Sequence, residues 1–287
     1  MKRLVFSSLL FLFLYLPVVL LIYYVTPLRW RNGVLLVFNL IFYGWGEPVY
    51  IVIMFLSTVI DYTHGILVGR CKRRGDDRGV RLAVCSSVVF NLALLFFFKY
   101  WDFVAGSLAA IGLPLMPILG LSLPIGISFY TFQTMSYTID VYRGDFPAER
   151  DPIAFALYVT YFPQLVAGPI ENPADLLPQL TKEHFWNKSD FFAGVRIALC
   201  GFFRKCVVAD VVGVYVSRVF AGADSANALA IFLAGALFCI QMYCDFAGYS
   251  EIAAGCARMM GVRLMRNFDR PYLSKSYTEF FRRWHIS

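Results

Sequence analysis

The sequence predicts an all-α membrane protein whose helices cross the bilayer several times. Of its 287 residues, 59% are hydrophobic, only 16% are charged and 17% are aromatic. A soluble globular domain is closer to half apolar and a quarter charged, whereas aromatic side chains gather where a chain crosses the membrane–water interface. The sequence shows no internal repeat, linker or soluble segment. We therefore expect one polytopic helical domain over residues 1–287, surrounded by the lipid bilayer.

The net charge of +7 agrees with loops that hold Lys and Arg on the cytoplasmic side of a membrane. Nucleic-acid binding would need a soluble basic face, which the sequence does not contain, so no nucleic-acid partner is expected. The 7 cysteines lie mostly in apolar runs, and neither they nor the 3 histidines have the spacing of a zinc site. We expect no disulfide framework and no bound metal.

Spanning helices need ~20 mostly apolar residues, and residues 4–25, 34–60 and 82–98 supply such runs. Gly46 and Pro48 interrupt the second run, which predicts a kink or two half-helices there. Residues 112–124 are rich in Gly and Pro and are predicted to form a loop or a re-entrant connection.

Two polar features surround the end of the second run. Asp61 and His64 lie three residues apart, on one helix face, and would suit either a catalytic pair or a hydrogen-bonded structural pair. Residues 70–81 hold six basic side chains against two acidic ones, an excess that predicts a cytoplasmic loop. The basic residues are Arg70, Lys72, Arg73, Arg74, Arg78 and Arg81, and the acidic ones are Asp76 and Asp77.

The middle of the chain mixes apolar and polar residues more than a simple spanning helix does. Residues 123–144 interleave Ser, Thr, Tyr and Gln with apolar side chains. Such a helix lines a polar cavity or bonds to neighbouring helices, and the sequence leaves both open. Further on, Pro163 and Pro169 stand on either side of Gly168 and predict a re-entrant elbow.

Charged residues also interrupt the later apolar runs. Arg204-Lys205 stands inside residues 191–214, which are expected to bend, tilt or lie partly in the interface because a charged pair is costly at the middle of a span. On the helix that follows residue 228, Gln241, Asp245 and Tyr249 form one polar stripe. Asp245 would be either a functional acid or a buried acid paired with an arginine.

The last residues predict a short helix at a membrane surface. Ser276 and Glu279 have the spacing of a capping box, and Arg282 and His285 lie three residues apart. The helix places apolar side chains in one stripe, Tyr277, Phe280, Phe281 and Trp284. It suits a cytoplasmic interface, although its terminal Arg-Arg-Trp-His could equally contact an acidic group of a ligand.

Several sequence blocks, in this order, resemble the membrane-bound O-acyltransferase (MBOAT) family. They are Val5-Phe-Ser-Ser8, Leu123-Pro-Ile-Gly-Ile-Ser-Phe-Tyr130, Ile139-Asp-Val-Tyr-Arg-Gly144, Phe162-Pro-Gln-Leu-Val-Ala-Gly-Pro169, Tyr243-x-Asp-Phe-x-Gly-Tyr-Ser250, Asn267-Phe, Pro271-Tyr and Arg283-Trp-His-Ile-Ser287. The chain is most similar to the bacterial branch with the alginate O-acetylation and teichoic-acid D-alanyl transfer proteins. The resemblance covers essentially the whole chain and implies an MBOAT-like helical bundle with re-entrant or interfacial segments.

The resemblance also implies a function. MBOAT proteins transfer an acyl group from a cytoplasmic thioester, here acetyl-CoA or an acyl-carrier protein as substrate, to a hydroxyl group. For this branch the expected acceptor is an exported polysaccharide, reached with a periplasmic or extracellular acetylation partner protein, and the expected location is the inner membrane. His285 matches the first of two family histidines, Asp245 would support the site, and Arg282 and Arg283 would hold the donor.

The second family histidine, which would act as general base, belongs beyond Ser287. We therefore expect the chain to be C-terminally incomplete and inactive as given. Neither His64 nor His184 lies in the matching context. D-alanyl or lipid acyl transfer on the same scaffold, a polytopic transporter or channel, and a non-catalytic remnant are the alternatives that the residues leave open.

Overall fold

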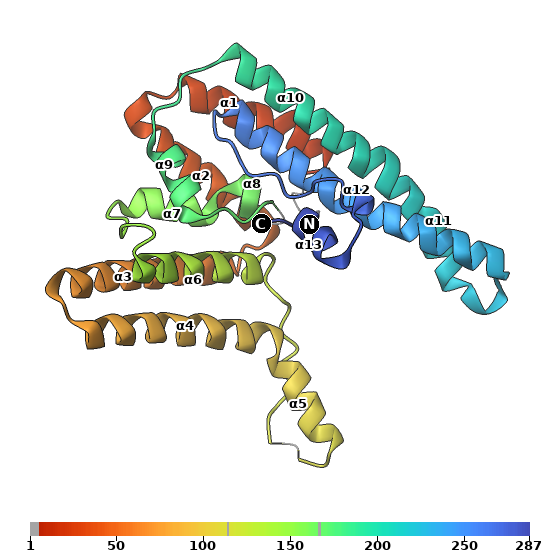
Figure 1. The fold of residues 1–287 in the computed structure, drawn as a ribbon, viewed down its shortest axis with the longest axis horizontal. Helices are drawn as coiled ribbons and strands as arrows, with labels where there is room; N and C mark the ends of the chain where they lie inside the picture. Colours follow the sequence, from red (N-terminus) through yellow and green to blue (C-terminus); the bar gives the residue numbers. More distant parts are fainter. Residues whose placement is uncertain (1–5, 114, 166–167) are drawn as a thin grey trace. The chain divides into compact units, whose positions relative to one another are not determined.

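The computed structural model describes residues 6–113, 115–165 and 168–287, and every regular element in these ranges is a helix. Figure 1 shows the helices in chain order. Three of them are long and apolar enough to cross a membrane: α3 (Ile51–Arg74), α4 (Asp77–Lys99) and α12 (Ala228–Met259). The all-α fold of a polytopic membrane protein is thereby confirmed.

The remaining elements are shorter. Before α3 lie η1 (Phe11–Tyr15), α1 (Leu16–Val25) and α2 (Leu28–Gly46). Between α4 and α12 lie α5 (Trp101–Ala110), α6 (Ile127–Arg143), α7 (Pro152–Thr160), α8 (Phe162–Leu165), α9 (Pro173–Thr181), α10 (Lys188–Phe202), η2 (Phe203–Ala209), α11 (Asp210–Ala221) and η3 (Ala223–Ser225). After α12 come η4 (Pro271–Leu273) and α13 (Tyr277–Arg283).

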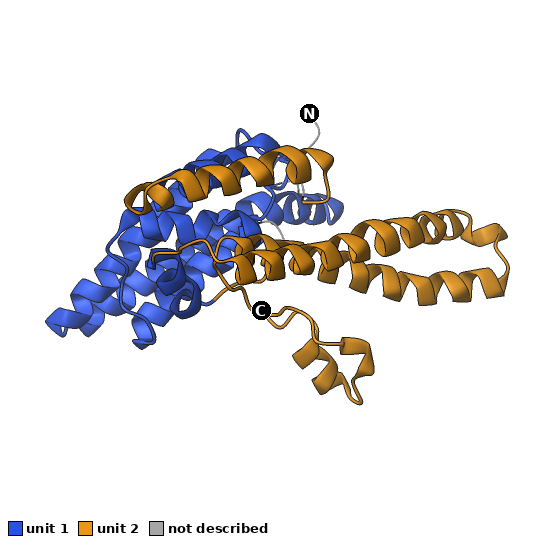
Figure 2. Ribbon diagram, turned by 90° about the horizontal axis from the view of Figure 1, so that it is seen from above, with its two compact units in different colours: residues 1–2, 32–166, 172–182 blue, residues 3–31, 167–171, 183–287 orange. Residues whose placement is uncertain are grey.

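Contacts divide the chain into two compact units, which Figure 2 shows in two colours. Of the described residues, unit 1 holds 32–165 and 172–182, and unit 2 holds 6–31, 168–171 and 183–287. Unit 1 is built on α3, α4 and α6, and unit 2 on α12 with α10, η2 and α11. The single family domain over residues 1–287 stays a prediction.

The interrupted apolar run in unit 1 forms two separate helices. α2 ends at Gly46 and α3 begins at Ile51, as the proline after Gly46 predicts. α3 ends at Arg74 and is capped by Gly75. The φ of Gly75 is 68°, a left-handed conformation that glycine adopts without strain. Asp76 caps the start of α4 by accepting from the Gly79 amide at 2.9 Å. The basic residues 70–81 thus surround a tight α3–α4 turn.

Two polar residues of α6 bond to other elements of unit 1. Gln133 donates to the carbonyl of Tyr158 at 2.9 Å, and Tyr137 accepts from the amide of Glu149 at 2.8 Å. Both side chains are buried in unit 1. Of the two alternatives that the sequence left open for this helix, these two contacts favour packing, whereas Ser136 and Thr138 bond to carbonyls of α6 itself and the buried Thr131 hydroxyl has no hydrogen-bond partner in the described structure.

Asp61 and His64 do not bond to each other, so their predicted pairing is wrong. Asp61 is buried and accepts hydrogen bonds from Ser87 and Asn91 of α4, each at 2.8 Å. His64 instead reaches Ser86 at 2.9 Å and its own helix at the Ile60 carbonyl. Helical spacing put both side chains near one face, but α4 supplied closer partners for each.

Other segments agree in part with the sequence. The run predicted over 4–25 is helical from residue 9 in the described chain, and its first residues, 4 and 5, lie outside the described residues. The segment 112–124 is irregular wherever it is described. In the predicted elbow, Pro163 and Pro169 are buried, whereas residues 166 and 167 fall outside the described ranges.

Unit 2 depends on a close approach of α10 to α12. A Cβ on Gly201 would lie 2.6 Å from the carbonyl oxygen of Gly248, and a Cβ on Gly194 would lie 2.7 Å from that of Gly255. Each helix thus places two glycines seven residues apart, on one face, where the opposite backbone comes nearest. Small residues at such positions let membrane helices pack backbone against backbone.

The charged pair Arg204-Lys205 lies in the π-helical turn η2 that follows this close contact. A π-turn widens the helix and commonly occurs at functional positions. Here α10, η2 and α11 continue as one helical path along α12, so the expected departure from a simple span takes the form of a wide turn.

We predict that Gly248→Ala destabilises the protein whereas Gly235→Ala, in the same helix, does not. The new methyl group at residue 248 would meet the Gly201 carbonyl at 2.8 Å, while nothing lies within 4 Å at residue 235. Overpacking costs about 1–3 kcal/mol, and an open helical site gains up to ~1 kcal/mol from alanine. Thermal unfolding in detergent measures both, and equal midpoints would contradict the glycine contact.

Candidate active site

One face of α12 receives the residues that follow it. Tyr243, Phe246 and Ser250 lie on this face at helical spacing, and each contacts the segment 267–285. Tyr272 extends the contact by donating to the carbonyl of Cys239 at 2.7 Å. Burial raises the pKa of Tyr272 above its ordinary value.

His285 is held at the end of this face. Its ring meets Phe246 edge-on, with 4.9 Å between ring centroids, and lies 6.5 Å from the ring of Phe268. Its backbone φ of 49° is left-handed, outside the helix α13 that ends at Arg283. The predicted common helix face of Arg282 and His285 is therefore wrong, because the chain leaves the helix between them.

Asn267 joins the histidine segment to α12. Its side-chain nitrogen donates to Ser250 at 3.1 Å, and its side-chain oxygen accepts from the hydroxyl of Ser287 at 3.0 Å. Its carbonyl accepts from the amide of Ile286 at 3.0 Å. One buried amide thus fixes the residues on the C-terminal side of His285, whose Nδ1 is 3.3 Å from the hydroxyl of Ser287. Among the described residues, Nε2 of His285 has no hydrogen-bond partner.

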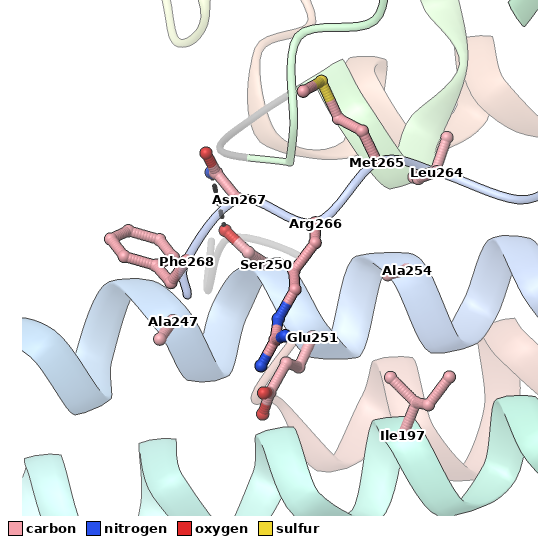
Figure 3. A pocket seen from close by; sticks show the side chains of 10 residues that line it. All are labelled: Ile197, Ala247, Ser250, Glu251, Ala254, Leu264, Met265, Arg266, Asn267 and Phe268. Carbon is pink, nitrogen blue, oxygen red and sulfur yellow. Dashed lines mark hydrogen bonds between the residues drawn. The ribbon is translucent and has the colours of Figure 1, made fainter. Parts of the chain in front are cut away.

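A cavity of about 270 Å³ lies beside this junction, in unit 2. Figure 3 shows the hydrogen bond between Asn267 and Ser250 at its wall and the Arg266 side chain directed toward Glu251. Most of the other lining side chains are apolar. The lining residues are Ile197, Ala247, Ser250, Glu251, Ala254, Leu264, Met265, Arg266, Asn267 and Phe268. The cavity therefore offers an apolar space with a few polar groups, as small-molecule sites do.

Asp245 points to the π-turn. Its carboxylate lies 2.7 Å from the amine of Lys205, which also lies 2.6 Å from that of Asp210. The Asp245 side chain is 50% exposed, so the expectation of a buried acid paired with an arginine is wrong in both respects. The wide turn places Lys205 beside Asp245. No contact between Asp245 and His285 is found in the described chain.

Arg204, the neighbour of Lys205, pairs with Glu251 of α12. Sequence reasoning did not single out Glu251, although it carries the same signal as Asp245, an acid inside an apolar helix. One of its oxygens is buried and has no hydrogen-bond partner in the described structure. Glu251 therefore belongs both to the ion pair with Arg204 and to the lining of the cavity.

The predicted surface helix α13 is present, and its cap is confirmed. Ser276 accepts from the amide of Glu279 at 3.1 Å. Arg283 is bound to Glu279 at 2.6 Å, whereas Arg282 is exposed. Its role as a donor-binding residue, like that of Arg283, stays a prediction.

The other two histidines make structural contacts within their own units. His64 bonds to Ser86 and Ile60 in unit 1. In unit 2 the carbonyl of His184 accepts from Arg31, and its ring lies 2.7 Å from where a Cβ of Gly261 would stand. Neither is among the residues that line the cavity described above.

We predict that Lys205→Met lowers thermal stability more than Asp245→Asn. Loss of the lysine leaves two neighbouring carboxylates without their shared partner, whereas loss of the Asp245 charge leaves Lys205 paired with Asp210. The expected cost is about 1–2 kcal/mol, reduced from the buried-pair value because the carboxylates are half exposed. Unfolding in detergent measures it, with Lys188→Met as control. A loss no larger than in that control would contradict the shared pairing.

Comparisons with known proteins agree with the resemblance drawn from the sequence blocks. The family model described as "MBOAT, membrane-bound O-acyltransferase family" matches residues 146–287. A probable alginate O-acetylase of Azotobacter vinelandii is 41% identical over 99% of this chain and 57% of its own length. The corresponding protein of Pseudomonas aeruginosa is 41% identical over 99% of this chain and 54% of its own.

A peptidoglycan O-acetyltransferase of Helicobacter pylori is 29% identical over 99% of this chain and 59% of its own length. The chain thus spans a little more than half the length of these relatives. The residues that match the family model, 146–287, include those that line the cavity, the face of α12 and the Arg-Trp-His-Ile-Ser segment. The chain belongs to the membrane-bound O-acyltransferase family.

Proposed function

We propose that this chain serves in a membrane O-acetyltransferase that esterifies hydroxyl groups of an exported polysaccharide. The observation that carries the proposal is the placement of His285 against α12, in contact with Phe246 and with Phe268 of the cavity wall, in a chain 41% identical to a probable alginate O-acetylase. The proposed location is the inner membrane, with the acetyl donor at the cytoplasmic side. A periplasmic acetylation protein or the polysaccharide itself is the proposed partner.

The proposed reaction is attack of an acceptor hydroxyl on the carbonyl carbon of a thioester. The new C–O bond forms as the C–S bond breaks, and the thiolate leaves with the proton that the hydroxyl loses. A hydroxyl is a weak nucleophile until a positioned base removes this proton, and imidazole has a suitable pKa. The donor is proposed to be acetyl-CoA or an acyl-carrier protein.

In this scheme His285 orients a reacting group at the mouth of the cavity. Its Nδ1 faces Ser287, and its ring contacts the rings of Phe246 and Phe268. Nε2 remains to bond to the acceptor hydroxyl or to the thioester carbonyl. Asp245 supports the site through Lys205, which braces the π-turn against α12. The exposed Arg282 suits the phosphates of coenzyme A or the acidic surface of a carrier protein.

We predict that His285→Gln, introduced into the chromosomal gene, removes most ester-linked acetate from the exported polysaccharide. Glutamine keeps hydrogen-bonding capacity but lacks the imidazole ring that contacts Phe246, so the reacting group would be misplaced and the rate should fall ~10²-fold. Alkaline release of acetate from purified polysaccharide measures the effect, with the protein level checked by immunoblot.

His64→Gln is the matched control, because His64 bonds to Ser86 and Ile60 within unit 1. It should leave the acetate content near that of the parent strain. Near-parental acetate in the His285→Gln strain would sink the proposed role of this residue. Release of D-alanine or a longer acid in place of acetate would favour the alternative acyl transfers, and a defect confined to solute uptake would favour transport.

A further inference from the structure

A second concave site lies in unit 1 and is formed by other residues than the candidate active site. It has a volume of about 450 Å³ and is formed where the last turns of α3 meet the segment 144–151, which follows α6. Its lining is Tyr62, Ile66, Arg70, Arg73, Ala148 and Arg150. An adjoining hollow of about 490 Å³ shares Arg73, Ala148 and Arg150 and adds Lys72. Cationic side chains from two separate elements therefore converge on one space.

The backbone that carries these arginines is firmly held. A Cβ on Gly69 would lie 2.9 Å from the Cβ of Ala148, so the segment lies directly against α3. Tyr62 donates to the carbonyl of Arg150 at 2.6 Å. Lys72 donates to the carbonyl of Tyr142 at 2.8 Å and thereby covers the end of α6. The site is built by specific contacts that do not use the three guanidinium groups.

The charges of the three arginines are left without partners inside the protein. In the described part of the chain, none of their guanidinium groups forms an ion pair or a hydrogen bond. The two carboxylates next to Arg150 in the sequence bond to backbone amides instead: Glu149 accepts from the amides of Arg150 and Asp151, and Asp151 accepts from the amide of Ile153. Three like charges around one cavity repel one another, and a bound anion would remove this repulsion.

We propose that Arg70, Arg73 and Arg150 bind a phosphate ester, and that the phosphate belongs to the headgroup of an anionic phospholipid. Arginine forks match phosphate oxygens in pairs, so three of them around one space suit this group better than a single-point anion. The site lies at the end of the long apolar helix α3, where the headgroups of a leaflet meet the protein. Basic clusters next to spanning helices attract anionic lipids.

A solvated row of cytoplasmic charges would contain the same residue types, but it would not need a cavity. The same segment provides the comparison, because Arg74, Arg78 and Arg81 are equally basic and line neither hollow. If charge alone attracts the lipid, both sets of arginines contribute equally. If the pocket binds the phosphate, only the first set does.

The test is native mass spectrometry of the full chain, purified in detergent and exposed to phosphatidylglycerol or phosphatidylcholine. The pocket variant replaces Arg70, Arg73 and Arg150 with Gln, and the control variant replaces Arg74, Arg78 and Arg81 with Gln. We expect the parent and the control to retain phosphatidylglycerol in preference to phosphatidylcholine. In the pocket variant, the amount of bound phosphatidylglycerol should fall at least tenfold. If a triple variant fails to fold, Arg150→Gln is compared with Arg143→Gln, which lines neither hollow.

A second arm identifies the source of the phosphate. Glycerol 3-phosphate at millimolar concentration should displace little of the lipid, because it lacks the acyl chains. If glycerol 3-phosphate displaces phosphatidylglycerol from the parent protein, the phosphate site stands, and its ligand is a soluble phosphate ester. Equal loss of phosphatidylglycerol in both triple variants, or undiminished retention in the pocket variant, would overturn the proposal.

Discussion

The close approach of α10 to α12 is the constraint on which the rest of unit 2 depends. Four glycines remove the side chains that would hold these helices apart, and the backbones meet at positions 194, 201, 248 and 255. Because the helices are so near, the π-turn after α10 brings Arg204 and Lys205 within bonding distance of Glu251 and Asp245. Charges in an apolar segment are thereby paired at the position where the helix widens.

α12 thus packs against two different parts of unit 2. Toward α10 and η2 it presents glycines and acids, and toward the segment 267–287 it presents aromatic rings and Ser250. The cavity lies between these surfaces and is lined by residues of both, including Glu251 and Asn267. A shift of α12 against α10 would change the ion pairs and the setting of His285 together, so the proposed activity depends on packing that does not touch the histidine.

Sequence reasoning identified the blocks that form this region, because they contain residue types with few alternative uses: a capping box and Arg-Trp-His-Ile-Ser. It did not predict what depends on distant partners. Helical spacing placed Asp61 beside His64, but Ser87 and Asn91 of α4 bind the acid. The π-turn gave Asp245 a lysine partner, and the left-handed backbone at His285 took that residue off the helix. The pairing of Arg204 with Glu251 joins positions 47 residues apart and has no local signal.

Asn267 holds the His285 segment on α12 through Ser250, and a double-mutant cycle on acetate transfer tests this link most directly. Ser250→Ala, Asn267→Ala and the double variant are compared in the chromosomal gene by the ester-linked acetate of the exported polysaccharide. Because the two side chains share one buried hydrogen bond, the double variant should be no worse than Asn267→Ala alone, which corresponds to a coupling of about 1 kcal/mol. Losses that multiply in the double variant would contradict the claim.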